Sequence, residues 1–228
     1  MVKDSPAETT RVAEDYVTLI WKACEWPDDG RRPTTTELAA SLGVTLSTVS
    51  ANLKRLAREG LIRYEPYGAI ELTEQGEQIA LQMVRRHRLI ETFLVQQLGY
   101  PWDQVHDEAD RLEHAVSDTL MDRIDALLGY PEIDPHGDPI PRQGSAPAIS
   151  ATLLSGCAPG ELVQIVRISD EEPDILKFLA DQRIALGTPL QVETPMAATG
   201  LMTVRHGTNT IQLSAPIAAA IHVTAPRD

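Results

Sequence analysis

Residues 106–114, in the middle of the chain, carry side chains that commonly bind metal ions: His106, Asp110, Glu113 and His114. In an α-helix each residue turns by ~100°, so these side chains would share a stripe roughly 100° wide. Carboxylates and imidazoles crowded on one face are costly without a counter-charge, and a divalent cation supplies it. The spacing therefore predicts a metal site. The alternative is a solvated acidic helix face with incidental histidines.

His87 and Glu91 lie in a long helical pattern over residues 77–98. Their spacing of four places both side chains on one helical face, close enough to share a cation. The next helix is expected to begin near Trp102 or Asp103. The chain has two cysteines, Cys24 and Cys157, which are far apart and offer neither zinc-ribbon spacing nor a disulfide framework. We therefore treat them as isolated thiols.

The N-terminal part of the chain has the pattern of a helix-turn-helix. Apolar residues at helical spacing predict a helix over residues 13–24. Hydroxyl residues 34–36 precede a short helix over residues 37–42, and Gly43 ends it. A second helix opens at residues 45–48 and ends at Gly60. Two short extended runs, residues 61–65 and 69–72, flank a Pro/Gly turn and predict a hairpin in the position of a wing.

The second of these helices has two faces. Leu53 and Leu56 point inward, whereas small hydroxyl residues at its start can approach bases or phosphates closely. The candidate DNA-binding residues share its start or its outer face: Thr45, Ser47, Thr48, Ser50, Ala51, Asn52, Lys54 and Arg55. A small helical domain with a hairpin that binds no DNA is the alternative.

The net charge of −13 opposes DNA binding. Binding remains possible if basic residues concentrate on one element or if cations offset the clustered acids. No stretch is long and apolar enough to span a bilayer, and the N-terminus lacks the apolar core of a secretory signal. We therefore expect a cytoplasmic protein without membrane contact.

Three segments resemble, in order, the diphtheria toxin repressor family of metal-dependent transcriptional repressors. They are RRHRLIETFL (Arg85–Leu94), VHDEADRLEHAVSD (Val105–Asp118) and DPHGDPIP (Asp134–Pro141). The resemblance covers nearly the whole chain. It implies an iron- or manganese-dependent repressor with a winged helix, a helical dimerisation domain and an SH3-like domain.

The expected fold is therefore mainly α with β. We expect a winged helix-turn-helix domain over residues 1–74 and a helical dimerisation and metal-binding domain over residues 75–141. Residues 142–155, rich in Pro, Ser, Ala and Gly, are typical of a linker. Short strands with glycine turns predict a small β-barrel over residues 156–228, and the resemblance identifies it as SH3-like.

The resemblance also implies two metal sites in each subunit. One would use His87, Glu91 and His106, together with an acid from the C-terminal domain, for which Glu172 and Asp174 are the candidates. The other would use Asp110, Glu113 and His114, together with Asp15 from the first helix. A ligand on the first helix would tie the DNA-binding domain to the dimer core.

The residue types at two of these positions favour manganese. Iron-responsive members of the family carry Met at the position of Asp15 and Cys at the position of Asp110. Hard carboxylate oxygens suit Mn²⁺, whereas sulfur ligands favour later transition metals. Some manganese members add a carboxylate one turn after Asp15, and this chain has Thr18 there. We expect Mn²⁺, with Fe²⁺ as the alternative and Zn²⁺ or Co²⁺ able to substitute in vitro.

These features predict a homodimer that binds double-stranded operator DNA when Mn²⁺ is bound and represses metal-uptake genes. An iron-dependent repressor of the same family is one alternative. Another is a constitutive DNA-binding protein with a structural metal. A metal-dependent hydrolase is disfavoured, because the cluster has no separate nucleophile or general base. We therefore expect no enzymatic activity.

Overall fold

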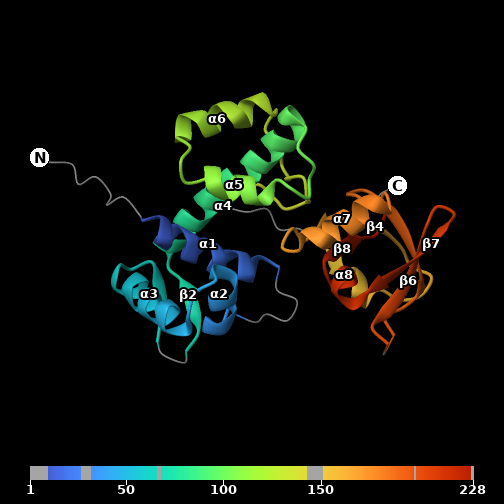
Figure 1. The fold of residues 1–228 in the computed structure, drawn as a ribbon, viewed down its shortest axis with the longest axis horizontal. Coiled ribbons are helices and arrows are strands. Elements are labelled where there is room, and N and C mark those ends of the chain that lie inside the picture. The colour runs from blue at the N-terminus through green and yellow to red at the C-terminus, as the bar shows by residue number, and fades with distance from the viewer. Residues whose placement is uncertain (1–9, 27–31, 66–67, 143–150, 198, 227–228) are drawn as a thin grey trace, which may run out of the picture. The chain divides into compact units, whose positions relative to one another are not determined.

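The computed structural model describes residues 10–26, 32–65, 68–142, 151–197 and 199–226 (Figure 1). It divides into two compact units. The first spans residues 1–86 and 141–146, and the second spans residues 87–140 and 147–228. No helix among the described residues is both long and apolar enough to cross a membrane.

The first unit contains the predicted helix-turn-helix and hairpin. Its elements are α1 (Arg11–Glu25), α2 (Thr35–Leu42), α3 (Leu46–Arg58), β1 (Ile62–Tyr64), β2 (Ile70–Leu72) and the N-terminal part of α4 (Glu74–Leu98). Thr34 and Glu37 form a capping box at the start of α2, and Gly43 closes it in the left-handed conformation. Pro66 and Tyr67 of the predicted hairpin turn lie outside the described residues.

The recognition-type helix α3 is held by the core of the first unit. Val49, Leu53 and Leu56 are fully buried, as predicted for the inner face. They pack with Tyr16 of α1 and with apolar residues of the hairpin. The outer face of α3 is therefore positioned by the packing of its inner face against α1 and the hairpin.

The helical part of the second unit comprises the C-terminal part of α4, α5 (His106–Leu112) and α6 (Asp118–Leu127). The predicted start of α5 near Trp102 or Asp103 is wrong. Residues 102–105 form turns instead, because the amide of Gln104 donates to the carbonyl of Pro101 at 3.0 Å. The carbonyl of Trp102 accepts a tertiary hydrogen bond from Nε2 of His136 at 2.8 Å.

The C-terminal part of the second unit is a small β domain. Its elements are β3 (Thr152–Leu153), η1 (Leu154–Gly156), β4 (Leu162–Ile168), α7 (Pro173–Asp181), β5 (Pro189–Thr194), β6 (Leu201–His206), β7 (Asn209–Ser214), α8 (Ala215–Ala219) and β8 (Ile221–Thr224). The strands form an antiparallel sheet in the order β3-β8-β4-β5-β6-β7.

The core of this β domain begins earlier than expected. Leu154, inside the stretch predicted as linker, is fully buried in it. Residues 143–150 of that stretch lie outside the described residues. The predicted combination of helical and SH3-like β structure is confirmed.

Candidate metal centre

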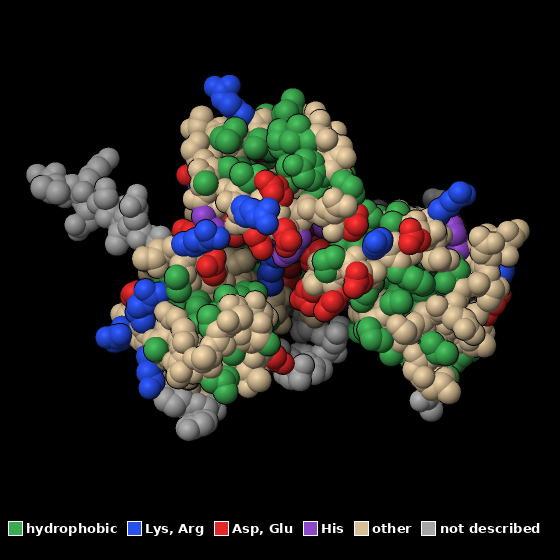
Figure 2. All heavy atoms as spheres, viewed as in Figure 1, with side chains coloured by type: hydrophobic (Ala, Val, Ile, Leu, Met, Phe, Trp, Pro, Cys, Tyr) green, Lys and Arg blue, Asp and Glu red, His purple; other side chains and the backbone are tan. Residues whose placement is uncertain are grey.

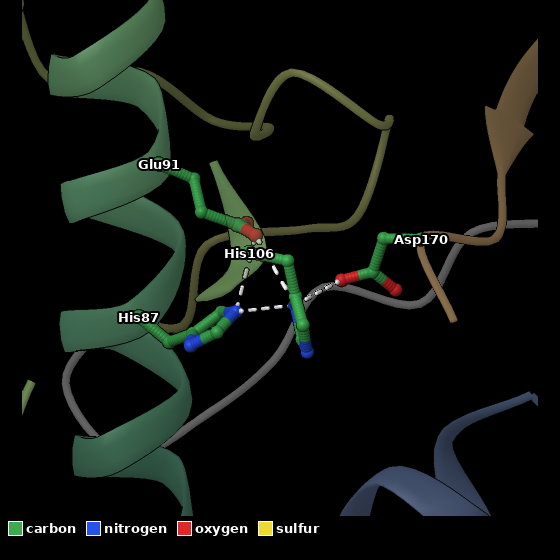
Figure 3. A group of neighbouring side chains, drawn as sticks. All are labelled: His87, Glu91, His106 and Asp170. Carbon is green, nitrogen blue, oxygen red and sulfur yellow. Dashed lines mark hydrogen bonds and ion pairs between the residues drawn. The ribbon is translucent and has the colours of Figure 1, made fainter. Parts of the chain in front are cut away.

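Four side chains from three separate segments converge in the second unit (Figure 3). His87 and Glu91 project from α4, with Nε2 and Oε1 3.1 Å apart. Nδ1 of His106, at the start of α5, lies 3.2 Å from Nε2 of His87 and 3.5 Å from Oε1 of Glu91. Oδ2 of Asp170, between β4 and α7, lies 3.1 Å from the same His106 nitrogen. These four residues are called the inner cluster below.

Asp170 takes the place expected for Glu172 or Asp174. Those two residues are exposed, at the N-cap and in the first turn of α7, and the structure does not bring them into the inner cluster. Asp170 lies two residues after the end of β4 and three before α7, so it is nearer to the strand than Glu172 or Asp174. The sequence feature that could have identified Asp170 is its position, since it is the first acidic residue after the strand that ends at Ile168.

A second group of ligand atoms forms around the other nitrogen of His87. Nδ1 of His87 lies 2.7 Å from Oε2 of Glu113 and 3.3 Å from Oδ1 of Asp110. Nε2 of His114 lies 3.2 Å from Oε1 of Glu113. His87, Asp110, Glu113 and His114 are called the outer cluster below. His87 thus offers one nitrogen to each cluster.

The outer cluster is assembled differently from the predicted helical stripe. Helix α5 ends at Leu112, and Glu113 is its C-cap, so His114 lies beyond the helix. The structure nevertheless brings Asp110 and Glu113 together at His87. Asp15 lies on α1 in the first unit, so its participation stays a prediction.

Asp134 and His136 were not among the predicted ligands, although sequence analysis singled out their DPHGDPIP segment. Ligand atoms of Glu91, Asp134 and His136 lie within 4.8 Å of one another, and all three residues are buried. Within the described residues, Oε2 of Glu91 and Nδ1 of His136 have no hydrogen-bond partner. Because Nε2 of His136 donates to the carbonyl of Trp102, Nδ1 of the neutral ring carries the free lone pair. The two orphaned atoms fit a bound cation.

Protons balance the buried carboxylates in the metal-free chain. Burial alone would lower the pKa of His106, but hydrogen bonds to Asp170 and Glu91 outweigh it and raise that pKa to about 9. Burial opposes protonation of His136 too, yet the Glu91 carboxylate, whose Oε2 lies 3.8 Å from Nδ1, raises the pKa of this ring to about 9. A bound cation would therefore replace imidazole protons.

The two neighbouring carboxyl groups shift in opposite directions. Burial would raise the pKa of Glu91, but the charge of His87 and the rings of His106 and His136 nearby hold it well below its usual range. Burial raises the pKa of Asp134 to about 8, and the charges of Asp138 and Glu91 add to that effect. Glu91 is therefore the anionic centre of the inner cluster.

The donor set contains only nitrogen and oxygen atoms. Among the described residues, no cysteine joins either cluster: Cys24 is exposed on α1 and Cys157 is buried in the β domain. Imidazole with carboxylate accommodates Mn²⁺, Fe²⁺, Co²⁺ and Zn²⁺, and the two carboxylates in each cluster suit the harder end of that series. The residues present thus fit a divalent transition metal.

The candidate DNA-binding residues lie on α3 as expected. Oγ1 of Thr45 caps the helix by accepting from the amide of Thr48 at 3.2 Å. Exposed candidates are Thr45, Ser47, Thr48, Ala51 and Lys54, whereas Ser50, Asn52 and Arg55 are half-buried. Nδ2 of Asn52 donates to the Tyr16 hydroxyl at 3.3 Å, so this amide also contacts α1. Figure 2 shows Lys and Arg side chains gathered over the region of α3.

Sequence profiles of known families match three successive parts of the chain. Residues 8–70 match the iron-dependent repressor, N-terminal DNA-binding domain. Residues 73–142 match the iron-dependent repressor, metal-binding and dimerisation domain. Residues 152–225 match the FeoA domain. The order of the three matches follows the order of the domains in the structure.

Two curated relatives align along most of the chain. The iron-dependent repressor IdeR of Mycobacterium leprae is 32% identical over 197 residues, covering 81% of this chain and 84% of that protein. The diphtheria toxin repressor of Corynebacterium diphtheriae is 28% identical and covers 92% and 95%. The alignment with IdeR of Mycobacterium tuberculosis is 36% identical over 134 residues and spans 57% of that relative's length.

Solved structures of repressors are also similar. A manganese-dependent transcriptional repressor in complex with manganese is 46% identical with a TM-score of 0.88, and the match covers 93% of this chain and 99% of that one. The manganese regulator SloR is 30% identical, with a TM-score of 0.79 and coverage of 93% and 98%. ScaR with bound Zn²⁺ is 30% identical, with a TM-score of 0.80 and coverage of 93% and 99%.

Proposed function

We propose, because this chain belongs to the diphtheria toxin repressor family of metal-dependent repressors, that it is a transcriptional repressor activated by Mn²⁺. It binds operator DNA as a homodimer in the cytoplasm and controls metal-uptake genes. The observation that carries the proposal is the pair of clusters around His87, built from nitrogen and oxygen donors without sulfur. No enzymatic activity is proposed for a chain of this family.

The inner and outer clusters would each hold one cation. His87, Glu91, His106 and Asp170 would hold the first, with His136 and Asp134 adjacent to Glu91. Asp110, Glu113 and His114 would hold the second, with Asp15 joining from α1. When bound, a divalent cation supplies positive charge that offsets these carboxylates. The ring of His87 joins the two sites, since each of its nitrogens faces one cluster.

Asp15 is well placed on α1 to transmit metal binding to α3. Its neighbour Tyr16 is buried in the core of the first unit, and its hydroxyl accepts from Nδ2 of Asn52 on α3. Fixing Asp15 would therefore fix α1 and, through that core, the recognition helix. Two such helices in a dimer could then enter successive major grooves, as helix-turn-helix dimers do.

Within each recognition helix, the exposed hydroxyls and Lys54 would meet the DNA. The hydroxyls at the start of α3 suit close contacts to bases or phosphates, and Lys54 supplies charge. Half-buried Ser50, Asn52 and Arg55 complete the proposed face. The negative charge of the whole chain confines attractive contacts to this basic surface.

An iron-dependent repressor is the second candidate, because the similar IdeR proteins of Mycobacterium are iron-dependent repressors. The carboxylates at positions 15 and 110 favour Mn²⁺ over Fe²⁺. Fluorescence anisotropy on a promoter fragment from the source genome decides between them. Chelated protein is titrated separately with Mn²⁺ and with anaerobic Fe²⁺. We expect activation at a lower free concentration of Mn²⁺.

Two other results would count against the proposal. Equal or better activation by Fe²⁺ would leave the repressor assignment but remove the manganese assignment. DNA binding that needs no added metal would indicate a constitutive DNA-binding protein with a structural metal.

A further inference from the structure

We propose that residues 134–138, called the seat below, dock the β domain onto the helical domain and thereby hold Asp170 in the inner cluster. Gly137 and the ion pair between Asp138 and Arg167 are the positioning elements. This inference rests on the proposed function, because Asp170 matters only if the cluster binds a cation.

The seat is a turn closed by its own hydrogen bonds. Oδ1 of Asp134 accepts from the amides of His136 at 2.8 Å and Asp138 at 2.9 Å. The amide of Asp134 donates to the carbonyl of Asp138 at 2.9 Å. These groups are buried, so the bonds are shielded from competing water. The seat is therefore a fixed surface against which another element can be placed.

Strand β4 lies directly against the seat. The amide of Ile168 donates to the carbonyl of His136 at 2.9 Å. Gly137 has a φ of +95°, and a Cβ atom there would lie 2.1 Å from the carbonyl oxygen of Val166. It would also lie 2.9 Å from Cα of Arg167. Both obstacles are backbone atoms, so a side chain at position 137 must push the strand away.

A buried ion pair fixes the same contact. Nε of Arg167 on β4 donates to Oδ1 of Asp138 at 2.7 Å. Nη2 of Arg88 on α4 lies 3.6 Å from that oxygen, and its Nη1 donates to the carbonyl of Pro139 at 2.6 Å. Asp138 and Arg88 are both almost fully buried. One carboxylate therefore connects the strand that leads to Asp170 with the helix that carries His87.

The last contact of β4 with the seat, at Ile168, lies close in sequence to the proposed ligand Asp170. Ile168 precedes Asp170 by two residues, and a chain spans at most about 3.5 Å per residue. Displacement of β4 from the seat would therefore displace Asp170 as well, and with it the carboxylate beside His106. Trp102 supports the same interface, since it stacks on His136 and packs against the core of the β domain. Changes to such supporting groups typically weaken metal affinity by about 10- to 100-fold.

The test compares Gly137→Ala with Gly129→Ala. Gly129 has a similar φ of +73°, but a Cβ atom there would meet nothing within 4 Å. Both variants place alanine at a positive φ, but only Gly137→Ala brings a Cβ atom against the backbone of β4. Amide exchange of Ile168, followed by NMR in the full-length metal-free chain, measures docking. We expect exchange at least about tenfold faster in Gly137→Ala than in Gly129→Ala, because the seat no longer protects this amide.

Calorimetric titration with Mn²⁺ measures the consequence for the inner cluster. We expect Gly137→Ala to weaken binding by about tenfold or more and Asp170→Ala to do the same. The double variant should be no weaker than Asp170→Ala alone, because both changes remove one ligand. A general loss of stability would instead weaken the double variant further. The inference would be overturned if a well-folded Gly137→Ala chain bound Mn²⁺ with wild-type affinity. It would also be overturned if the losses of Mn²⁺ affinity in Gly137→Ala and Asp170→Ala added fully in the double variant.

A second variant covers the case in which Gly137→Ala does not fold. Arg167→Gln removes the ion pair to the seat, and Arg205→Gln is its control, because Arg205 pairs with Glu193 within the β domain. Only Arg167→Gln should speed exchange at Ile168 and weaken Mn²⁺ binding. If the wild-type chain bound no Mn²⁺, the proposed function would fail. Unchanged exchange at Ile168 in Arg167→Gln would overturn the docking itself.

Discussion

The inner and outer clusters share His87 but differ in burial and in the origin of their residues. Every member of the inner cluster lies in the second unit, and Glu91 at its centre has no exposed surface. In the outer cluster, the side chain of Asp110 is 52% exposed. A buried cluster completed within one unit suits retention of a cation. If Asp15 of the first unit is the further ligand, as proposed, the more open cluster suits a sensor that must change the state of that unit.

The largest effect is expected from Glu91→Gln. It removes the buried charge that lies between His87 and His106, and leaves Asp170 as the one carboxylate of the inner cluster. We expect a loss of about 3 kcal/mol in the free energy of unfolding of the metal-free chain, measured with denaturant. Mn²⁺ binding at the inner cluster should be lost as well.

Glu108→Gln is the control for this change. It removes the same charge from α5, where Glu108 pairs with Arg111 near the surface. We expect less than about 1 kcal/mol there. Similar losses in the two variants would mean that Glu91 is not the electrostatic centre of the inner cluster.

The sequence predicts an element well when neighbouring residues determine it, and poorly when residues far apart in the sequence do. Helix α2 was predictable because Thr34, Glu37 and Gly43 act on their near neighbours. The start of α5 was not, because the Trp102 carbonyl bonds to His136, far away in the sequence. Helical spacing correctly paired His87 with Glu91.

The same limit applies to Asp170, which completes the inner cluster, and to His136, which lies beside Glu91. Asp170 reaches His106 only because β4 packs on the seat, and no local pattern encodes that contact. His136 stood in a segment already noted for its resemblance, yet its role depends on the position of Glu91. Helical spacing and the family resemblance therefore supplied His87, Glu91 and His106, and tertiary packing supplies Asp170.

The double substitution Asp15→Met with Asp110→Cys sharpens the comparison at the outer cluster. It replaces hard oxygen donors with sulfur donors that favour Fe²⁺. We expect the ratio of Mn²⁺ to Fe²⁺ concentrations at half-maximal DNA binding to rise by about tenfold, equivalent to ~1.4 kcal/mol. Asp15→Met with Asp107→Cys is the control, because Asp107 belongs to neither cluster among the described residues. An unchanged ratio would remove Asp15 and Asp110 as determinants of metal choice.

Lys54→Ala is expected to have the smallest effect and to leave both clusters intact. Lys54 is exposed on α3, in the first unit, and its proposed partner is a DNA phosphate. Operator affinity should fall at low salt, and the slope of log affinity against log salt should shrink by about 1. Lys177→Ala, on exposed α7 of the β domain, is the matched control and should change neither quantity. Calorimetry should give wild-type Mn²⁺ affinity for Lys54→Ala. Weakened metal binding in that variant would mean that α3 contributes to the clusters, and the division between sensing and DNA-contacting residues would then fail.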